Sequence, residues 1–202
     1  MARYCFYIDG FNVYYALQQT PRYRKYKWLN YRKLAEAVVQ AEDEIAGIFY
    51  FTAVVKWKPQ NAARHERYIK ALRSVGVETI RGRFMKKHIK CHLCGRPFLT
   101  HEEKQSDVNI ALRMLADAME DMYDKALIIS ADSDLLPVIK SIQQHAPEKE
   151  IGVMFPIGYT SFELRQNAGF RRKMSEKLLR DCQFPDEVEL GSTVITRPES
   201  WR

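Results

Sequence analysis

The chain has 202 residues, 46% of them hydrophobic, which is enough to bury one core of ordinary size and predicts a single domain with a short tail. Lysine and arginine exceed aspartate and glutamate by 32 − 25 = 7, a surplus that favours a polyanionic partner. The sequence contains no run of 18 apolar residues and begins without a charged-then-apolar leader, so we expect a soluble, cytoplasmic protein with no membrane partner.

Strand-like and helix-like segments alternate along the chain. Clusters of β-branched and aromatic residues predict strands at residues 4–8, 45–55, 77–84, 126–129 and 150–155. Helical periodicity beside turn or capping residues predicts helices at residues 31–40, 61–75, 107–122 and 135–144.

This alternation predicts an α/β protein with a three-layer α/β/α fold and a mostly parallel central sheet of about five strands. The domain is expected to cover residues 1–180. Residues 181–202 are acidic and rich in turn-forming residues, and we expect them to form a C-terminal tail.

Polar residues follow two of the predicted strands. The first strand ends in YCFYIDGFN, which places Asp9 and Asn12 in a glycine-containing turn, and the fourth ends in LIISADSD, with Ser130, Asp132 and Asp134. In open α/β sheets, ligands bind at the carboxyl ends of the strands. Helix capping is the alternative interpretation, but it accounts for one residue of the second group and leaves the other carboxylate unexplained.

Asp107 begins the apolar face of the helix predicted at residues 107–122, because the apolar residues after it keep the i, i+3, i+4, i+7 spacing. A first-turn acid that complements the helix dipole is an equally good interpretation. If Asp9, Asp107, Asp132 and Asp134 converge, they need a cation, since unpaired carboxylates cannot share a low-dielectric space. Oxygen ligands select Mg²⁺ or Mn²⁺, and water activated by such an ion attacks phosphodiesters.

Two basic segments carry much of the positive charge. Cations alternate with aromatic residues over residues 22–33, and a second run comprises Arg81, Arg83, Lys86, Lys87 and Lys90. Cations for phosphates and rings for unpaired bases are typical of single-stranded nucleic-acid binding. For the first segment, a solvated loop whose rings fold onto the core is an equally good interpretation.

A cysteine hairpin is expected at about residues 85–102. Its spacing is typical of a zinc knuckle, with four candidate ligands: His88, Cys91, Cys94 and His101. His92 lies between the cysteines and is expected to point away. A redox pair is less favoured, because the motif does not open a helix after a strand, and two unligated thiols are the remaining alternative.

Three segments resemble the signature segments of the NYN-domain family of PIN-like ribonucleases, which includes the LabA-like bacterial proteins: IDGFN, HEEKQSDVNIALRMLADA and ALIISADSDLLPVI. The resemblance covers most of residues 3–170. It implies a PIN-like fold and Mg²⁺- or Mn²⁺-dependent cleavage of RNA. By position, it also implies metal-binding roles for Asp9, Asp107, Asp132 and Asp134.

The resemblance further implies supporting roles around these acids. Asn12 would hold Asp9 or the scissile phosphate by hydrogen bonds, and Ser130 would support the loop that carries Asp132. Glu103 would lie outside the direct ligands, and Lys104 would contact phosphate.

One position departs from the family pattern. Relatives often carry an acid where this chain has Arg113, which lies about 120° around the helix from Asp107. The absence of an acid at this position would weaken metal binding, or Arg113 would add a contact to phosphate.

The sequence thus favours a metal-dependent endoribonuclease with RNA as its partner. The substrate contacts expected are Lys104, Arg113, Arg81, Arg83, Lys86 and Lys87. One alternative is a non-catalytic RNA-binding or regulatory module with a degraded metal site. A phosphohydrolase with an Asp-x-Asp nucleophile is less favoured, because the first strand offers only Asp9. The sequence leaves open whether the chain forms a homodimer.

Overall fold

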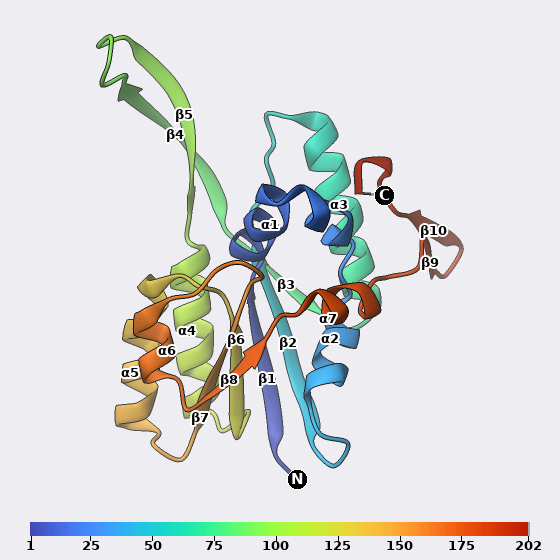
Figure 1. The fold of residues 1–202 in the computed structure, drawn as a ribbon, viewed down its shortest axis with the longest axis vertical. Coiled ribbons are helices and arrows are strands. Elements are labelled where there is room, and N and C mark those ends of the chain that lie inside the picture. Colours follow the sequence, from blue (N-terminus) through green and yellow to red (C-terminus); the bar gives the residue numbers. More distant parts are fainter. Residues whose placement is uncertain (202) are drawn as a thin grey trace.

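The computed structural model describes residues 1–201 and places a six-stranded sheet at the centre of the molecule (Figure 1). All neighbouring strands are parallel, and their order is β3-β2-β1-β6-β7-β8. The strands are β1 (Arg3–Asp9), β2 (Glu44–Thr52), β3 (Glu78–Arg81), β6 (Lys125–Ile129), β7 (Glu150–Phe155) and β8 (Phe170–Lys173). The predicted parallel sheet is confirmed, with a sixth strand at one edge.

Helices cover both faces of this sheet, as the sequence of β1 requires. Phe6 and Ile8 point into one apolar cluster, whereas Cys5 and Tyr7 point into the other. The first cluster is covered by α1 (Gly10–Gln19), α2 (Tyr31–Val38), α3 (Pro59–Ser74) and α7 (Glu176–Asp181). The second is covered by α4 (Ser106–Met119), α5 (Leu136–His145) and α6 (Phe162–Asn167). The three-layer α/β/α architecture is therefore confirmed (Figure 1).

The segment after β1 is helical rather than the turn that its glycine suggested. Asp9 adopts an extended backbone conformation and its side chain accepts a hydrogen bond from Asn12 N, so it caps α1. Gly10 is the first residue of this helix. A side chain does not fit there, because a Cβ would lie 2.5 Å from Tyr50 Cζ and 2.7 Å from Phe51 O. The tight fit of this residue, and not a turn, explains the glycine.

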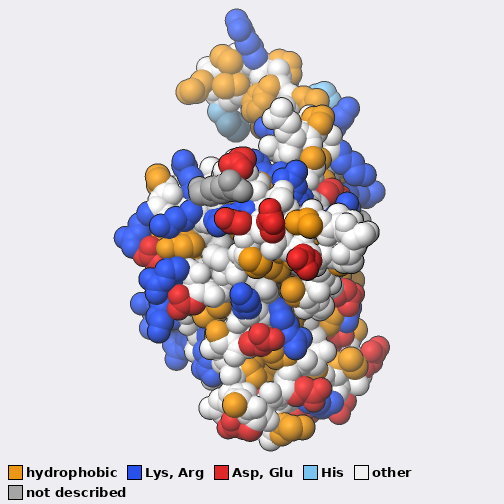
Figure 2. Space-filling model, turned by 90° about the vertical axis from the view of Figure 1, so that its right-hand side faces the viewer, with side chains coloured by type: hydrophobic (Ala, Val, Ile, Leu, Met, Phe, Trp, Pro, Cys, Tyr) orange, Lys and Arg blue, Asp and Glu red, His pale blue; other side chains and the backbone are white. Residues whose placement is uncertain are grey.

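The strand expected at residues 77–84 divides into two at Gly82. β3 ends before this residue, and β4 (Arg83–Lys90) leaves the sheet to pair with β5 (Pro97–Lys104) as an antiparallel hairpin. A Cβ at Gly82 would lie 2.6 Å from the backbone oxygen of Lys104, so glycine lets the two strands pass this closely. The hairpin projects away from the body of the molecule, as Figures 1 and 2 show.

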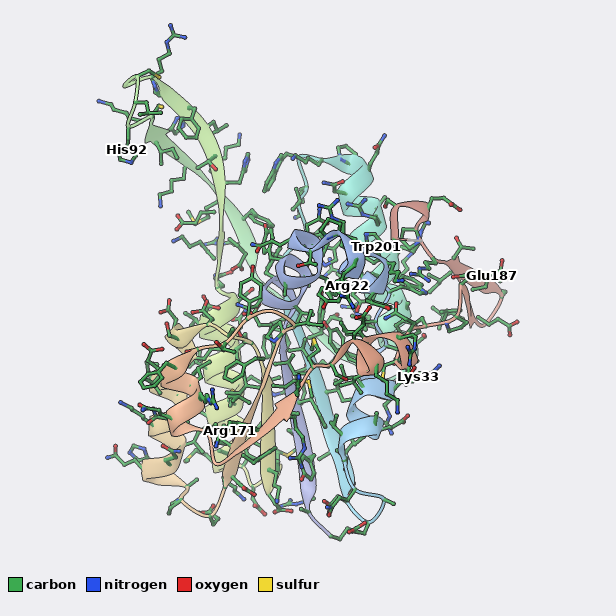
Figure 3. All side chains as sticks on the ribbon, viewed as in Figure 1. Arg22, Lys33, His92, Arg171, Glu187 and Trp201 are labelled. Carbon is green, nitrogen blue, oxygen red and sulfur yellow. The ribbon has the colours of Figure 1, made fainter. Side chains whose placement is uncertain are left out.

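The C-terminal residues pack against the domain that they follow. They form β9 (Glu187–Leu190), β10 (Thr193–Thr196) and the 3-10 turn η3 (Glu199–Trp201). Trp201, labelled in Figure 3, is only 4% exposed. The centroid of its ring lies 5.4 Å from that of Tyr68 and 6.2 Å from that of Trp28. Residues expected to form a tail thus contribute a ring to the core beside α3.

Two further 3-10 turns complete the chain, η1 (Pro21–Lys27) after α1 and η2 (Ser133–Leu135) before α5. Within residues 1–201, every helix is too short or too polar to cross a bilayer.

Candidate functional site

The predicted acidic residues gather where β1 and β6 end. These two strands are neighbours at the centre of the sheet, and the chain runs from β1 to β2 on one side before returning to β6 on the other. The carboxyl ends of β1 and β6 therefore flank the topological switch point, which is where open α/β sheets bind ligands. Asp9 ends β1, Asp132 follows β6, and α4 brings Asp107 alongside.

Asp9 is the buried member of this group, with 5% of its surface exposed. Its Oδ1 accepts a hydrogen bond from Asn12 N at 3.0 Å, and its Oδ2 accepts one from Ser130 Oγ at 2.9 Å. Ser130 Oγ in turn accepts from Asp132 N at 3.0 Å. The Asn12 side chain accepts from Ala131 N at 3.0 Å. These bonds tie the loops after β1 and β6 together and fix the two carboxylates relative to each other.

Three carboxylates meet in this site. One oxygen each from Asp9, Asp107 and Asp132 lies within 4.8 Å of the other two. Burial raises the pKa of Asp9 to about 6, with Asp107 and Asp132 adding to the shift and the bonds from Asn12 and Ser130 opposing it. Burial and the charge of Asp132 also raise the pKa of Asp107. The site is therefore poised to accept positive charge.

The cavity beside these carboxylates has a volume of about 390 Å³. None of the residues found to line it is a lysine or arginine in the described part of the chain. A divalent cation is thus the simplest group that would neutralise the three acids, and a set of oxygen ligands suits a hard ion such as Mg²⁺ or Mn²⁺.

Glu103 and Ser106 close one side of this cavity. Glu103 Oε1 accepts hydrogen bonds from Ser106 Oγ at 2.7 Å and Ser106 N at 3.3 Å, which joins the end of β5 to the start of α4. Between them Gln105 has a φ of 85°, in the left-handed region. Glu103 also raises the pKa of Asp107, so its charge adds to the acidic field.

Asp134 lies outside the group of three. It is exposed, and its backbone N–H donates to Asp132 Oδ1 at 3.0 Å, which makes Asp132 the cap of η2. Its charge nevertheless contributes to the raised pKa of Asp107. The structure thus separates the two aspartates of the ADSD motif into one that meets the other acids and one at the rim.

Four lining residues carry no signal in the sequence that marks them as part of a site. Three of them lie on α1 and one follows β7, and their side chains form the uncharged wall of the cavity: Phe11, Tyr15, Gln19 and Tyr159. The helical face of α1 would have indicated the first three, had the segment been recognised as a helix.

Arg113 is held by ion pairs away from this cavity. Its Nε lies 2.8 Å from Asp117 Oδ1, and its Nη1 lies 3.1 Å from Glu78 Oε1. Its guanidinium also lies 3.9 Å from the ring centroid of Phe49. Asp117 further accepts a hydrogen bond from Tyr7 OH at 2.7 Å. Arg113 therefore links α4 to β2 and β3, and it does not line the acidic cavity.

The second basic segment divides between paired and exposed cations. Arg81 forms two hydrogen bonds of 2.7 Å to Glu66, and Lys87 lies 2.9 Å from Glu102. Lys104 also pairs with Glu102, at 3.2 Å. Three exposed cations of β4 lie outside these pairs: Arg83, Lys86 and Lys90. In the first segment Tyr26, Trp28 and Tyr31 are buried, which agrees with the interpretation that its rings fold onto the core.

The zinc ligands expected from the sequence are not brought together. His101 is opposite Lys86 in the hairpin, and its ring stacks on Trp57 with the centroids 3.5 Å apart. Cys91 lies five residues beyond Lys86, roughly 16 Å along an extended strand. His101 is therefore at the base of the hairpin, whereas the cysteines lie at its tip, near His92 (Figure 3).

The cysteine turn itself has formed. Gly95 N donates to Cys91 O at 2.8 Å, and hydrogen bonds from Cys94 and from the backbone of Leu93 lower the pKa of the Cys91 thiol. Among the residues that the structure describes, the one group of three or more histidine, cysteine or acidic side chains that meets is the acidic one. The expected tetrahedral set of Cys91, Cys94, His88 and His101 is thus not assembled.

Comparisons with known proteins agree with the fold. A family model described as NYN domain matches residues 3–171. The relative 6-hydroxy-3-succinoylpyridine 3-monooxygenase HspA from Pseudomonas putida is 28% identical, over 96% of this chain and 74% of the relative. The crystal structure of a protein of unknown function from Vibrio parahaemolyticus aligns with a TM-score of 0.61 and 21% identity, covering 87% of this chain and 94% of that chain. At this identity, the structural likeness shows the shared fold alone.

Proposed function

The chain belongs to the NYN domain family, and from this premise we propose that it is a metal-dependent endoribonuclease whose active site is formed by Asp9, Asp107 and Asp132. One observation carries the proposal. Three carboxylates from separate parts of the chain converge at the carboxyl edge of a parallel sheet, where burial and mutual repulsion raise the pKa of two of them. Such an arrangement is costly for stability, and a bound cation would offset the cost.

The donors fit Mg²⁺ or Mn²⁺, since all three are carboxylate oxygens. When bound, the ion would supply the positive charge that activates water and stabilises the developing charge on a phosphodiester. The separation of the three oxygens, within 4.8 Å, is compatible with shared coordination of one ion. No side-chain nucleophile is needed for this reaction class.

The surrounding residues would position these acids and the substrate. Ser130 and Asn12 hold the loops after β6 and β1, so the Asp9 and Asp132 carboxylates keep their geometry without a ligand. The exposed cations Arg83 and Lys86 lie on the strand that leads from the sheet into the projecting hairpin. They would attract the RNA backbone by charge.

Cleavage of a single-stranded RNA by the full chain in Mn²⁺ tests the proposal. Asp132→Asn and an excess of EDTA should each abolish cleavage, because each removes the cation from the site. Asp181→Asn on α7 is the matched control, since this exposed aspartate is remote from the acidic cavity, and it should cleave as the unmodified chain does. Cleavage that survives both EDTA and Asp132→Asn would contradict the proposal.

A second candidate is an RNA-binding module without catalysis. It is favoured by Arg113, which stands where family members often carry an acid and which pairs with Asp117 and Glu78. RNA binding that is tight in EDTA, with no cleavage in Mn²⁺ or Mg²⁺, would support this candidate over the first.

A third candidate comes from the name of the Pseudomonas relative, a 3-monooxygenase of 6-hydroxy-3-succinoylpyridine. The observation that favours a small aromatic substrate is a second cavity, lined by aromatic rings and by Lys27, Lys58 and Arg64. Turnover of 6-hydroxy-3-succinoylpyridine by a chain that leaves RNA intact would select this candidate.

A further inference from the structure

The second cavity lies on the far side of α1 from the three acids. It has a volume of about 330 Å³ and opens at the carboxyl end of β2, between α1 and α3. Its size is within the range of small-molecule sites. The C-terminal Trp201 forms part of its wall, beside α3 (Figure 3).

Aromatic rings make up much of the wall. Tyr14 comes from α1, Tyr50 from β2 and Tyr68 from α3, and the Trp201 ring packs edge-on against Tyr68 with the centroids 5.4 Å apart. The indole N–H of Trp201 is a buried donor without a hydrogen-bond partner in the described chain. Rings held by packing are ready to stack on a planar ligand at little cost in conformational entropy.

The cavity also contains buried positive charge. Lys27 is only 7% exposed, and its ammonium group lies 5.1 Å from the ring centroid of Tyr14 and contacts the side-chain oxygen of Gln18. Arg64 donates to Ser200 Oγ at 2.9 Å and to Asn61 Oδ1 at 3.2 Å. All of these partners are neutral.

The described lining of the cavity is positively charged. Lys27, Lys58 and Arg64 line it, and none of its described lining residues is an aspartate or glutamate. Burial lowers the pKa of Lys27 to about 8, and repulsion from Arg64 and Arg24 adds to the shift. A buried cation that is paired only with neutral groups destabilises the fold, and an anionic ligand would relieve that cost.

The two cavities share part of their walls. Phe11 and Tyr15 on α1 line both the acidic cavity and the aromatic one. A chain whose phosphate lies at the three acids can therefore reach the second cavity by passing around these two side chains.

We propose that this second cavity binds one nucleotide unit, with its base among the aromatic rings and its phosphate at Lys27 and Arg64. The choice of a nucleotide over other aromatic anions rests on the proposed ribonuclease function, because the two cavities are joined through Phe11 and Tyr15. The unit would then be a neighbour of the nucleotide that is cleaved. The anion-binding character of the cavity does not depend on that function.

Calorimetric titration with adenosine 5′-monophosphate tests this proposal. The full chain carries Asp132→Asn and is kept in EDTA, so the acidic site is disabled and RNA cannot be turned over. Arg64→Gln is compared with Arg67→Gln, a control that removes an exposed cation from the same helix. Lys58→Gln is a second test variant, because this exposed lysine can be replaced without disturbing the core if Arg64→Gln lowers stability.

We expect the nucleotide to bind more tightly than ribose 5-phosphate or inorganic phosphate, because the base stacks on the rings. Arg64→Gln should weaken binding about tenfold, the effect of losing one charge-assisted contact, and Lys58→Gln should weaken it less. Arg67→Gln should leave it unchanged. A short single-stranded RNA should compete with the nucleotide.

Several results would overturn the proposal. They are absence of nucleotide binding, equal binding by the Arg64→Gln and Arg67→Gln chains, or tighter binding of benzoate than of the nucleotide. Failure of RNA to compete would restrict the site to free nucleotides and refute its link with the acidic cavity. Nucleotide binding by a chain that cleaves no RNA in Mn²⁺ would refute the proposed function and leave this cavity as an independent nucleotide site.

Discussion

The acidic cavity and the aromatic cavity lie on opposite sides of α1 and have opposite charge. The first gathers three carboxylates with no lysine or arginine among its described lining residues, and the second gathers three cations with no acid among them. A fold selected only for stability would pair these charges across α1. Their segregation supports our two proposals, a cation bound on one side and an anionic ligand bound on the other.

Among the changes that test this contrast between the two cavities, Asp107→Asn is expected to have the largest effect. Loss of one carboxylate should reduce RNA cleavage at least about a thousandfold, because the cation loses a ligand and a charge. The same change should leave the melting temperature of the metal-free chain equal or higher, since it removes repulsion with Asp132 and Glu103. Cleavage rates in Mn²⁺ and thermal melts in EDTA measure the two effects. A variant that cleaves normally, or that unfolds, would remove the basis for the metal site.

His65 lines the aromatic cavity, and its neutral state predicts that the stability of the fold decreases in acid. Its Nε2 lies 3.0 Å from Thr52 Oγ1, and burial, with Arg81 and Arg64 adding to the effect, lowers its pKa to about 4. The unfolded chain takes up this proton below about pH 6.5. The free energy of unfolding should therefore decrease as pH falls from about 6.5 to 4, by up to about 3 kcal/mol. Below pH 4 this loss should be complete.

Urea unfolding of the full chain across this pH range measures the loss. His65→Gln should flatten the dependence between pH 6.5 and 4 while keeping a hydrogen bond to Thr52 within reach. An unchanged pH profile in this variant would assign the acid sensitivity to other groups.

Gly10 follows Asp9 and lines the aromatic cavity, and a methyl group there should disturb the packing of that cavity. Gly10→Ala would force its Cβ against Tyr50 and the carbonyl oxygen of Phe51, so we expect about 2 kcal/mol of destabilisation. Gly76→Ala is not a neutral control, because that glycine has a φ of +79°. Ala63→Gly on the exposed face of α3 is a better one and should cost less, about 1 kcal/mol. Equal losses in the two variants would show that the space around Gly10 is not constrained.

The smallest effect is expected from Lys27→Met. Removing a buried cation without an acidic partner should stabilise the ligand-free chain, by about 1 kcal/mol, although the contact with Gln18 is lost. The same change should weaken nucleotide binding. Thermal melts with and without adenosine 5′-monophosphate separate the two effects. Destabilisation of the ligand-free chain would indicate that Lys27 has a structural role.

Three of the four predicted acids, Asp9, Asp107 and Asp132, do meet, because their positions depend on local pattern, whereas Asp134 lies at the rim. A strand that ends in aspartate places that residue at the sheet edge, and helical periodicity placed Asp107 on the buried side of α4. The rest of the acidic cavity could not be predicted in this way. The sequence did not indicate Phe11 and Tyr15, because the glycine beside Asp9 suggested a turn. In the structure, Gly10 is part of a helix and allows close packing.

The arrangement of the cysteine hairpin and of the C-terminal residues could not be predicted, because it depends on contacts between residues far apart in the sequence. Spacing along the chain suggested that His101 joins Cys91, but the hairpin register places them far apart, and register depends on strand pairing. Likewise, the composition after residue 181 gives no sign that Trp201 returns to pack beside α3. The sixth strand, β8, was missed because its sequence FRRK is mostly charged and lies at an exposed edge.

Anomalous diffraction from a crystal soaked in Mn²⁺ tests the central claim most directly. We predict a manganese peak in contact with Asp9, Asp107 and Asp132, and its loss in a crystal of the Asp132→Asn chain. A fully soaked crystal that shows no peak between these carboxylates would contradict the assignment of this site as a metal centre.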